Sequence, residues 1–190
     1  MEKNYIAEQT FEGKDLATDE FPKGDYEQCV FNGCNFSKCN LSDIRFIECE
    51  FSGCDLSMAK LENTSLRDVL FKECKMLGLR FETCNEFGLS FSFEGCKLNE
   101  SSFYKTSLKK TSFKNSLLHN ADFTECDLSS SIFDNCDLAG AIFNNTNLEK
   151  SDFGTSFNYS IDPESNRIKK ARFSIPAVTG LLSKYDIKIS

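Results

Sequence analysis

The sequence predicts an all-β solenoid, and three regularities support that prediction. An apolar residue, mostly Phe or Leu, recurs at every fifth position from Phe11 to Phe81 and, two residues out of phase, from Phe93 to Phe153. A small or modest residue lies two positions before almost every one of these central residues. Turn-forming pairs such as Asn32-Gly33 and Ser52-Gly53 follow the central residue. A period of five suits neither a helix nor an ordinary strand, whose side chains repeat about every 3.6 and 2 residues.

The spacing within one repeat indicates which side chains face the core. The small residue and the central residue are two positions apart, so in extended backbone both point to the same side. The residue between them faces outward, and the remaining two turn a corner. The ten cysteines all lie in the small column. Cysteines five apart, such as Cys29 and Cys34, fall on different sides of the coil and do not converge as zinc ligands do. We therefore expect free thiols that fill the core, and no metal site.

Composition and charge narrow the function classes. The net charge of −7 argues against direct binding of nucleic acid, which needs an excess of Lys and Arg. No apolar run is long enough to span a bilayer, and the first ten residues do not resemble a signal peptide, so we expect a cytoplasmic protein. The lone histidine, His119, follows central Leu118 and should be exposed and solvated. We find no catalytic constellation and no cofactor site, so the prediction is a protein that is not an enzyme.

The pattern small–polar–Leu/Phe–polar–any resembles the pentapeptide-repeat family. Stretches that match it include Cys34-Asn35-Phe36-Ser37-Lys38 and Ala121-Asp122-Phe123-Thr124-Glu125. The match is close over residues 26–81 and 93–153. The resemblance implies a right-handed quadrilateral parallel β-helix with four repeats in each coil. At that number, Phe11 to Phe173 makes about eight coils and a rod roughly 40 Å long, at ~4.8 Å per coil.

Two interruptions and the C-terminus depart from the repeat. Residues 82–92 contain two residues more than the phase allows, and are either a bulge or a loop that contacts a partner. Residues 156–170 form an irregular coil, after which Ile168 and Phe173 resume in phase. We expect the β-helix to occupy residues 1–173. Residues 174–190 should add a helix, beginning near Pro176, and a strand-like tail that together cap the open end.

The chain resembles in particular the quinolone-resistance (Qnr-type) members of the family. In those proteins a C-terminal helix and tail also build a two-fold dimer, and the rod is thought to imitate duplex DNA toward type II topoisomerases. The resemblance implies a homodimer and DNA gyrase or topoisomerase IV as partner. The expected dimer contacts are Leu181, Leu182, Ile187 and Ile189.

Charged residues on the outside give the candidate partner surface. The acidic candidates are Asp122, Glu125, Asp127, Asp134, Asp137, Glu149 and Asp152. In steps of twenty they ring the rod more than they line it. Four lysines, Lys105, Lys109, Lys110 and Lys114, should form a belt in which Lys105 lies near Glu125 and Lys114 near Asp134. The alternative function is a scaffold for another protein partner, suggested by the outward apolar residues Leu117, Ile132 and Ile142.

Overall fold

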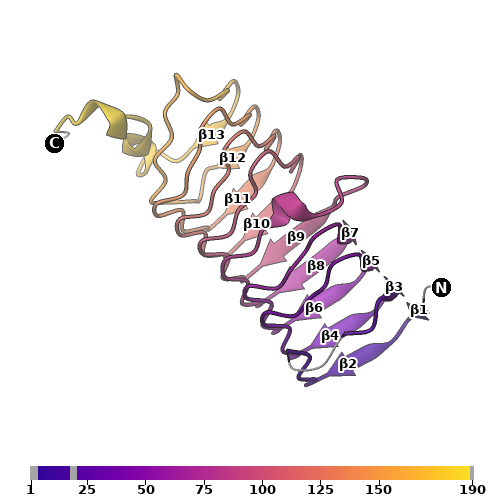
Figure 1. Ribbon diagram of the computed structural model, residues 1–190. Coiled ribbons are helices and arrows are strands. Elements are labelled where there is room, and N and C mark those ends of the chain that lie inside the picture. The colour runs from indigo at the N-terminus through magenta and orange to yellow at the C-terminus, as the bar shows by residue number, and fades with distance from the viewer. Residues whose placement is uncertain (1–3, 18–20, 189–190) are drawn as a thin grey trace.

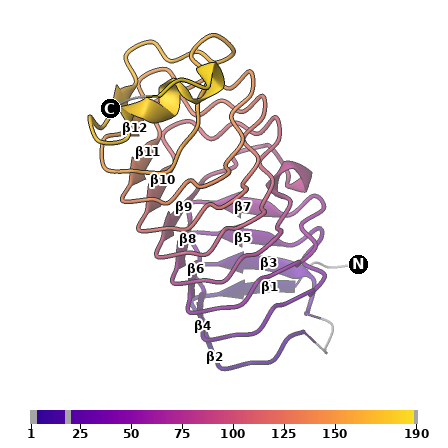
Figure 2. The same ribbon diagram turned by 90° about the vertical axis from the view of Figure 1, so that its left-hand side faces the viewer.

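The computed structural model describes residues 4–17 and 21–188, which form a rod of stacked coils with the termini at opposite ends (Figure 1). A nine-stranded parallel sheet runs along one side. In chain order its strands are β2 (Thr10–Glu12), β4 (Val30–Asn32), β6 (Glu50–Ser52), β8 (Val69–Lys72), β9 (Phe91–Glu94), β10 (Ser112–Lys114), β11 (Ile132–Asp134), β12 (Asp152–Phe153) and β13 (Arg172–Phe173). A four-stranded parallel sheet lies on the adjoining side of the N-terminal half (Figure 2). It consists of β1 (Asn4–Ala7), β3 (Gly24–Glu27), β5 (Arg45–Ile47) and β7 (Ser65–Arg67).

The strand register confirms the predicted coil. Phe31 lies opposite Phe51, a step of twenty residues, so four repeats of five make one turn. Across the phase break Phe71 lies opposite Phe93, a step of twenty-two. The other sides of the rod are joined by single bridges, such as Asn40 to Lys60, and so is the C-terminal continuation of the four-stranded side, as from Ser107 to Asp127. The chain is thus the predicted quadrilateral β-helix of about eight coils.

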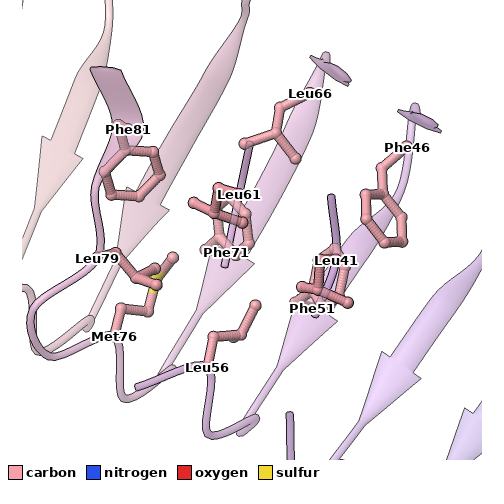
Figure 3. Close-up of a pocket in the computed structure, with 10 residues that line it drawn as sticks. All are labelled: Leu41, Phe46, Phe51, Leu56, Leu61, Leu66, Phe71, Met76, Leu79 and Phe81. Carbon is pink, nitrogen blue, oxygen red and sulfur yellow. The ribbon is translucent and has the colours of Figure 1, made fainter. Parts of the chain in front are cut away.

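The central residues fill the axis of the rod. They point inward from all four sides, as nine of the ten labelled side chains of Figure 3 show; the tenth, Leu79, belongs to the small column. One column of stacked phenyl rings runs the length of the nine-stranded sheet, with ring centroids 4.7 Å apart between Phe31 and Phe51 and 4.6 Å between Phe133 and Phe153. Stacked aromatic pairs add roughly 0.5–1.5 kcal/mol to the area that they bury, which accounts for the abundance of Phe.

The small column does more than fill space. Most of its thiols and hydroxyls donate a hydrogen bond to the carbonyl oxygen of the central residue one coil earlier. Cys74 Sγ lies 3.4 Å from the Phe51 oxygen, and Ser131 Oγ lies 2.6 Å from the Leu108 oxygen. A core filled only by small apolar groups would not need these residue types. The preference for Cys, Ser and Thr at this position therefore reflects a donor column that joins adjacent coils.

The corners place polar side chains in left-handed backbone. The second residue of most corners has a φ between about 50° and 70°, and glycine supplies only some of them. Lys38 and Asp43 adopt φ values of 59° and 63°. Such a residue costs roughly 1–2 kcal/mol, which packing of the flanking central residues must offset. Since corners recur every twenty residues, their side chains form ladders along the edges of the rod.

The phase break at 82–92 is accommodated on one side of the rod. Residues Phe81–Thr83 form a 3-10 helix, η1, in which Phe81 keeps its central position and stacks on Phe103 at 4.6 Å. Glu86, Phe87 and Gly88 are exposed and form a loop that projects beside β7 and β9 (Figure 1). The ladder of the nine-stranded sheet continues past this loop without interruption.

The C-terminal helix predicted over 174–184 is reduced to two short 3-10 helices, η2 (Val178–Leu181) and η3 (Ser183–Tyr185). Thr179 and Gly180 are poor helix formers, and Gly180 is drawn into a contact with the preceding coil. Its oxygen accepts a hydrogen bond from the Ile161 amide at 3.0 Å. The predicted strand-like tail is also absent through residue 188, because Asp186 turns into left-handed backbone at φ 49°.

An ion pair fixes this C-terminal segment to the irregular coil. Lys184 Nζ lies 2.7 Å from Asp162 Oδ1 and 2.6 Å from Glu164 Oε2. The phenol of Tyr185 donates to Glu164 Oε1 at 2.9 Å. The irregular coil is in turn joined to the regular one by buried Asn166, whose Nδ2 donates to the Phe143 oxygen at 3.0 Å. The last regular coil is therefore covered at its open end.

Candidate partner-binding surfaces

The ionisable side chains with catalytic potential are dispersed or buried. Within residues 4–17 and 21–188, no three His, Cys, Asp or Glu side chains lie close enough to hold a metal ion. All ten thiols are buried. Burial raises the pKa of Cys84, Cys126 and Cys136 to about 12, so these thiols stay protonated at neutral pH. In the same described ranges no helix is long and apolar enough to cross a bilayer.

His119 is not the solvated side chain that the sequence predicts. Its Nε2 atom lies 2.8 Å from Asp137 Oδ2, one coil further along the rod. Partial burial acts to raise the pKa of Asp137, but hydrogen bonds from His119 and Asn158 outweigh it and hold that pKa below its usual range. The contact was missed because His119 is a corner residue whereas Asp137 faces out from the side, so the two do not share a column.

The seven acidic candidates of residues 122–152 lie on all sides of the rod, and most are paired with a cation. The pairs are Glu125–Lys105 at 3.4 Å, Asp127–Lys109 at 3.3 Å, Glu149–Arg167 at 3.1 Å and Asp152–Arg172 at 3.1 Å, and Asp137 lies beside the His119 ring. Asp134 accepts from the Thr155 hydroxyl at 2.9 Å, and Asp122 accepts from the Thr124 amide at 2.8 Å. The positive charges of these partners cancel much of the negative electrostatic potential of the seven acidic residues.

Both neighbours predicted for the lysine belt are present, since Lys114 lies opposite Asp134 in the register of β10 and β11, but only Lys105 forms its ion pair with the predicted residue. Lys105 pairs with Glu125 as expected. Lys114 instead pairs with Glu94, at 3.0 Å, rather than with Asp134. Glu94 lies twenty residues earlier in the same corner position, so the Lys114 side chain reaches back one coil instead of forward.

The N-terminal half carries acidic side chains that the sequence analysis did not single out. Glu8, Glu27, Glu48 and Asp68, here called the acidic edge, follow the corner between the four-stranded and nine-stranded sheets. Three of them share the left-handed corner position, with φ values of 54°, 52° and 51° for Glu8, Glu48 and Asp68. No salt bridge to these four carboxylates is present among the described residues.

Neutral donors hold the acidic edge in place. Gln28 Nε2 donates to Glu48 Oε2 at 2.8 Å, and the Ser90 hydroxyl donates to Asp68 Oδ1 at 2.7 Å. Such partners order the carboxylates without neutralising them. The signal was present in the sequence, because a step of twenty at the corner position leads from Glu8 through Gln28 to Glu48 and Asp68.

The C-terminal end exposes a second, apolar surface. Leu182 and Ile187 are exposed, as the predicted dimer contact requires, and Ile175 is 89% exposed although the sequence analysis did not select it. Leu181 differs, because it packs against the core and acts in the cap. Ile189 lies outside the described residues.

Comparisons with known proteins identify a family with this architecture. A model of the pentapeptide repeat region matches residues 20–92 and 89–157. No curated protein matches the sequence.

Two solved proteins illustrate the likeness in fold. A trypsin-treated form of QnrB1, a plasmid-mediated fluoroquinolone resistance protein, is 18% identical with a TM-score of 0.62, over 98% of this chain and 100% of QnrB1. HetL of Nostoc sp. strain PCC 7120, a pentapeptide repeat protein involved in heterocyst differentiation regulation, is 17% identical with a TM-score of 0.58, over 89% of this chain and 85% of HetL. At this identity the likeness concerns the fold alone. With the family model matching most of the chain, the protein belongs to the pentapeptide-repeat family.

Proposed function

We propose that this chain is a non-enzymatic protein-binding rod of Qnr-like type, which acts in the cytoplasm as a DNA mimic toward DNA gyrase or topoisomerase IV and modulates sensitivity to quinolones. The observation that carries the proposal is the acidic edge on a rod that aligns with QnrB1 along its whole length. Pentapeptide-repeat proteins are binding solenoids rather than typical enzymes. The absence of a positive surplus makes direct contact with nucleic acid unfavourable.

The spacing of the acidic edge supports this proposal. Coils are stacked at about 4.8 Å, and the edge offers about one carboxylate per coil from Glu8 to Asp68. Each strand of duplex DNA carries one phosphate per roughly 3.4 Å of axis, which is a similar linear density of charge. A topoisomerase surface that binds DNA would meet a comparable row of anions. The seven acidic residues between Asp122 and Asp152 remain candidates for the same surface, with less free charge.

The C-terminal end supports a homodimer. Leu182, Ile187 and Ile175 are all exposed and belong to the C-terminal segment, which Lys184 joins to the irregular coil. Burying a side chain of this size is worth roughly 1.5–3 kcal/mol, so a two-fold contact that covers three on each protomer would be substantial. The dimer would double the length of the rod and bring two acidic edges to one partner.

A supercoiling assay with purified protein tests the proposal. Addition of the protein should inhibit supercoiling by gyrase, or protect gyrase from a quinolone. Charge reversal at Glu48 and Asp68 should remove that effect, whereas reversal at Glu100, away from the edge, should preserve it. If the wild-type protein changes neither the supercoiling rate nor the quinolone response, the proposal is overturned for gyrase. The corresponding activity assay with topoisomerase IV tests the proposal for that enzyme.

The alternative is a structural scaffold for another protein partner. It is favoured by outward apolar residues on the C-terminal coils, where Ile132 and Ile142 are 48% and 49% exposed and Leu117 is 36% exposed. These residues lie on three different sides, so a partner would have to wrap around the rod. Binding that survives charge reversal of the acidic edge and is lost on Ile132→Asp would favour this alternative.

A further inference from the structure

Beside the phase break, the backbone ladder between coils is interrupted on one side of the rod. On the side of the rod that carries the projecting loop, the Asn85 and Ser90 amides donate back to the Thr64 and Leu66 oxygens, both at 2.9 Å. Facing them, residues 104–108 make their backbone hydrogen bonds within their own coil or to the following coil, as in the Leu108 amide to the Asp127 oxygen at 2.8 Å. No backbone hydrogen bond joins 82–90 to 104–108 within the described chain.

The interruption is confined to that side. Next to it, the Phe81 amide donates to the Ser102 oxygen at 2.8 Å, and on the opposite flank β9 pairs with β10 through Phe93 and Phe113. Everywhere else on this side, bridges such as Ser107 to Asp127 connect consecutive coils. The two extra residues therefore separate two strand edges locally without disturbing the rest of the rod.

A groove occupies the resulting space. Leu89 and Phe81 form its apolar wall, and Tyr104 and Lys105 form the facing one. Glu82 and Glu86 contribute two carboxyl groups. The groove thus combines apolar and aromatic walls with two carboxyl groups, which accept hydrogen bonds when ionised, and with the donor Lys105.

The charges in the groove are only partly satisfied. Glu82 Oε1 accepts from Arg80 Nε at 2.9 Å, but its Oε2 atom is buried with no hydrogen-bond partner among the described residues. Lys105 is held by Glu125 at 3.4 Å and lies 4.8 Å from the centroid of its neighbour Tyr104. A half-satisfied buried carboxylate favours the approach of a cation.

The projecting loop already holds a guanidinium. Arg67 lies over the ring of Phe87, with its Cζ atom 5.0 Å from the ring centroid, and Phe87 is itself 75% exposed. The loop beside the groove is therefore suited to contact a planar cation on an aromatic face. A second guanidinium entering the groove would find Tyr104 on one wall and the two carboxyl groups within it.

We propose that this groove binds an arginine side chain of the protein partner. Arginine fits better than lysine because its planar fork donates to several acceptors at once and stacks on aromatic rings. The inference rests on the proposed role as a protein-binding rod, and it adds a specific pocket to the diffuse attraction of the acidic edge. It does not depend on which protein the partner is.

The test is an NMR titration of the full-length protein with acetyl-Leu-Arg-Leu-amide. Amides of residues 85–90 and 104–107 should shift in a saturable way, and acetyl-Leu-Gln-Leu-amide should produce no such shifts. Glu82→Gln should weaken binding about tenfold, as the loss of a charge-assisted hydrogen bond implies. Exposed Glu86→Gln should weaken it as well, whereas Glu100→Gln, a carboxylate outside the groove, should not.

Two outcomes would overturn the proposal. One is a set of shifts spread over the acidic edge and absent from the groove, which would mean non-specific attraction. The other is unchanged binding by both Glu82→Gln and Glu86→Gln, each verified as folded from its amide spectrum. Either result leaves the topoisomerase assay untouched, so failure of the groove and failure of the proposed function are distinguishable.

Discussion

The thiol of Cys54 lies 3.2 Å from the carbonyl oxygen of Phe31, the central residue one coil earlier. The same contact recurs between Cys136 and Phe113 at 3.4 Å. Each is a weak hydrogen bond made inside a stack of phenyl rings, and together they join coils that share no covalent link apart from the chain itself. The column of small residues is therefore a structural connection between coils and not a chemical site.

Removal of one donor should destabilise the rod measurably. Cys54→Ala loses the bond and leaves a small void in a close-packed core, so the free energy of unfolding should fall by about 1–2 kcal/mol. Cys54→Ser should cost less, because serine makes the same contact elsewhere in the column. Urea denaturation measures both, with outward-facing Lys60→Ala as the control. Equal midpoints for Cys54→Ala and Lys60→Ala would contradict the role of the donor.

The buried thiols should make the rod sensitive to alkali. Burial raises the pKa of Cys49 to about 11 and that of Cys84 and Cys126 to about 12, against about 8.5 in an unfolded chain. The full free energy of unfolding is retained at pH values below the thiol pKa of the unfolded chain. It falls as the pH rises toward the thiol pKa values of the folded protein, because the unfolded state then releases protons that the folded state retains. The urea midpoint should therefore fall between pH 8 and about pH 10.

A matched variant separates this effect from other titrations. Replacement of Cys49, Cys84 and Cys126 by serine should flatten the decline over the same pH interval, whatever it does to stability at pH 7. If the wild type and the triple variant lose stability in parallel, the thiols are not responsible.

The contacts of Lys184 with Asp162 and Glu164, here called the clamp, should weaken in acid. Hydrogen bonds from Lys184 hold the pKa values of Asp162 and Glu164 below their usual ranges. The clamp is therefore present above those usual ranges, and it weakens as the pH falls through the lowered folded-state values. Hydrogen-exchange protection of the Gly180 and Leu182 amides should drop below about pH 4. Lys184→Met should produce that drop at pH 7, and Lys188→Met should not.

Gly180 offers an independent way to detach the same segment. A Cβ atom there would collide with the carbonyl oxygen of Tyr159. Gly180→Ala should expose the last coil and, if the C-terminal end forms the dimer, should also yield monomers in sedimentation. Leu182→Asp with Ile187→Asp should yield monomers without loss of the clamp. A dimer that persists in this double variant would place the contact elsewhere.

The sequence was sufficient for the fold because a period of five with two inward columns has few structural solutions. The spacing of residues predicts the inward positions of Phe31, Phe51 and their equivalents. It also predicts the phase shift at 82–92 and the burial of the cysteines. The spacing does not predict which charged side chains form ion pairs, because that depends on the direction in which a long side chain extends. Lys114 reaches back to Glu94, and nothing in the spacing distinguishes that from a reach toward Asp134.

The C-terminus shows a different limit of the sequence. The apolar stripe around Leu181 and Leu182 is compatible with an α-helix, but the contact of Gly180 with the irregular coil decides the outcome. That contact joins residues about twenty positions apart in the chain. No local sequence pattern predicts that they lie together. The groove beside Tyr104 is of the same kind, since it arises from hydrogen bonds that are not made.

The two acidic regions should behave differently toward a partner. The double variant Glu125→Gln, Lys105→Met removes an ion pair that carries no net charge, so it should change association little. Glu48→Gln removes a free charge and should lower the association rate more, with a weaker dependence on salt. Association rates measured at low and moderate ionic strength check this order, and a larger effect of the double variant would contradict it.

Direct binding to gyrase tests the central claim most simply. The purified rod, immobilised through its N-terminus, should retain gyrase at low ionic strength. Retention should be displaced by duplex DNA and should be lost in the Glu48→Lys, Asp68→Lys variant with its fold intact. Gyrase binding that DNA does not displace, or that the charge reversal leaves unchanged, would contradict the account of this protein as a DNA mimic.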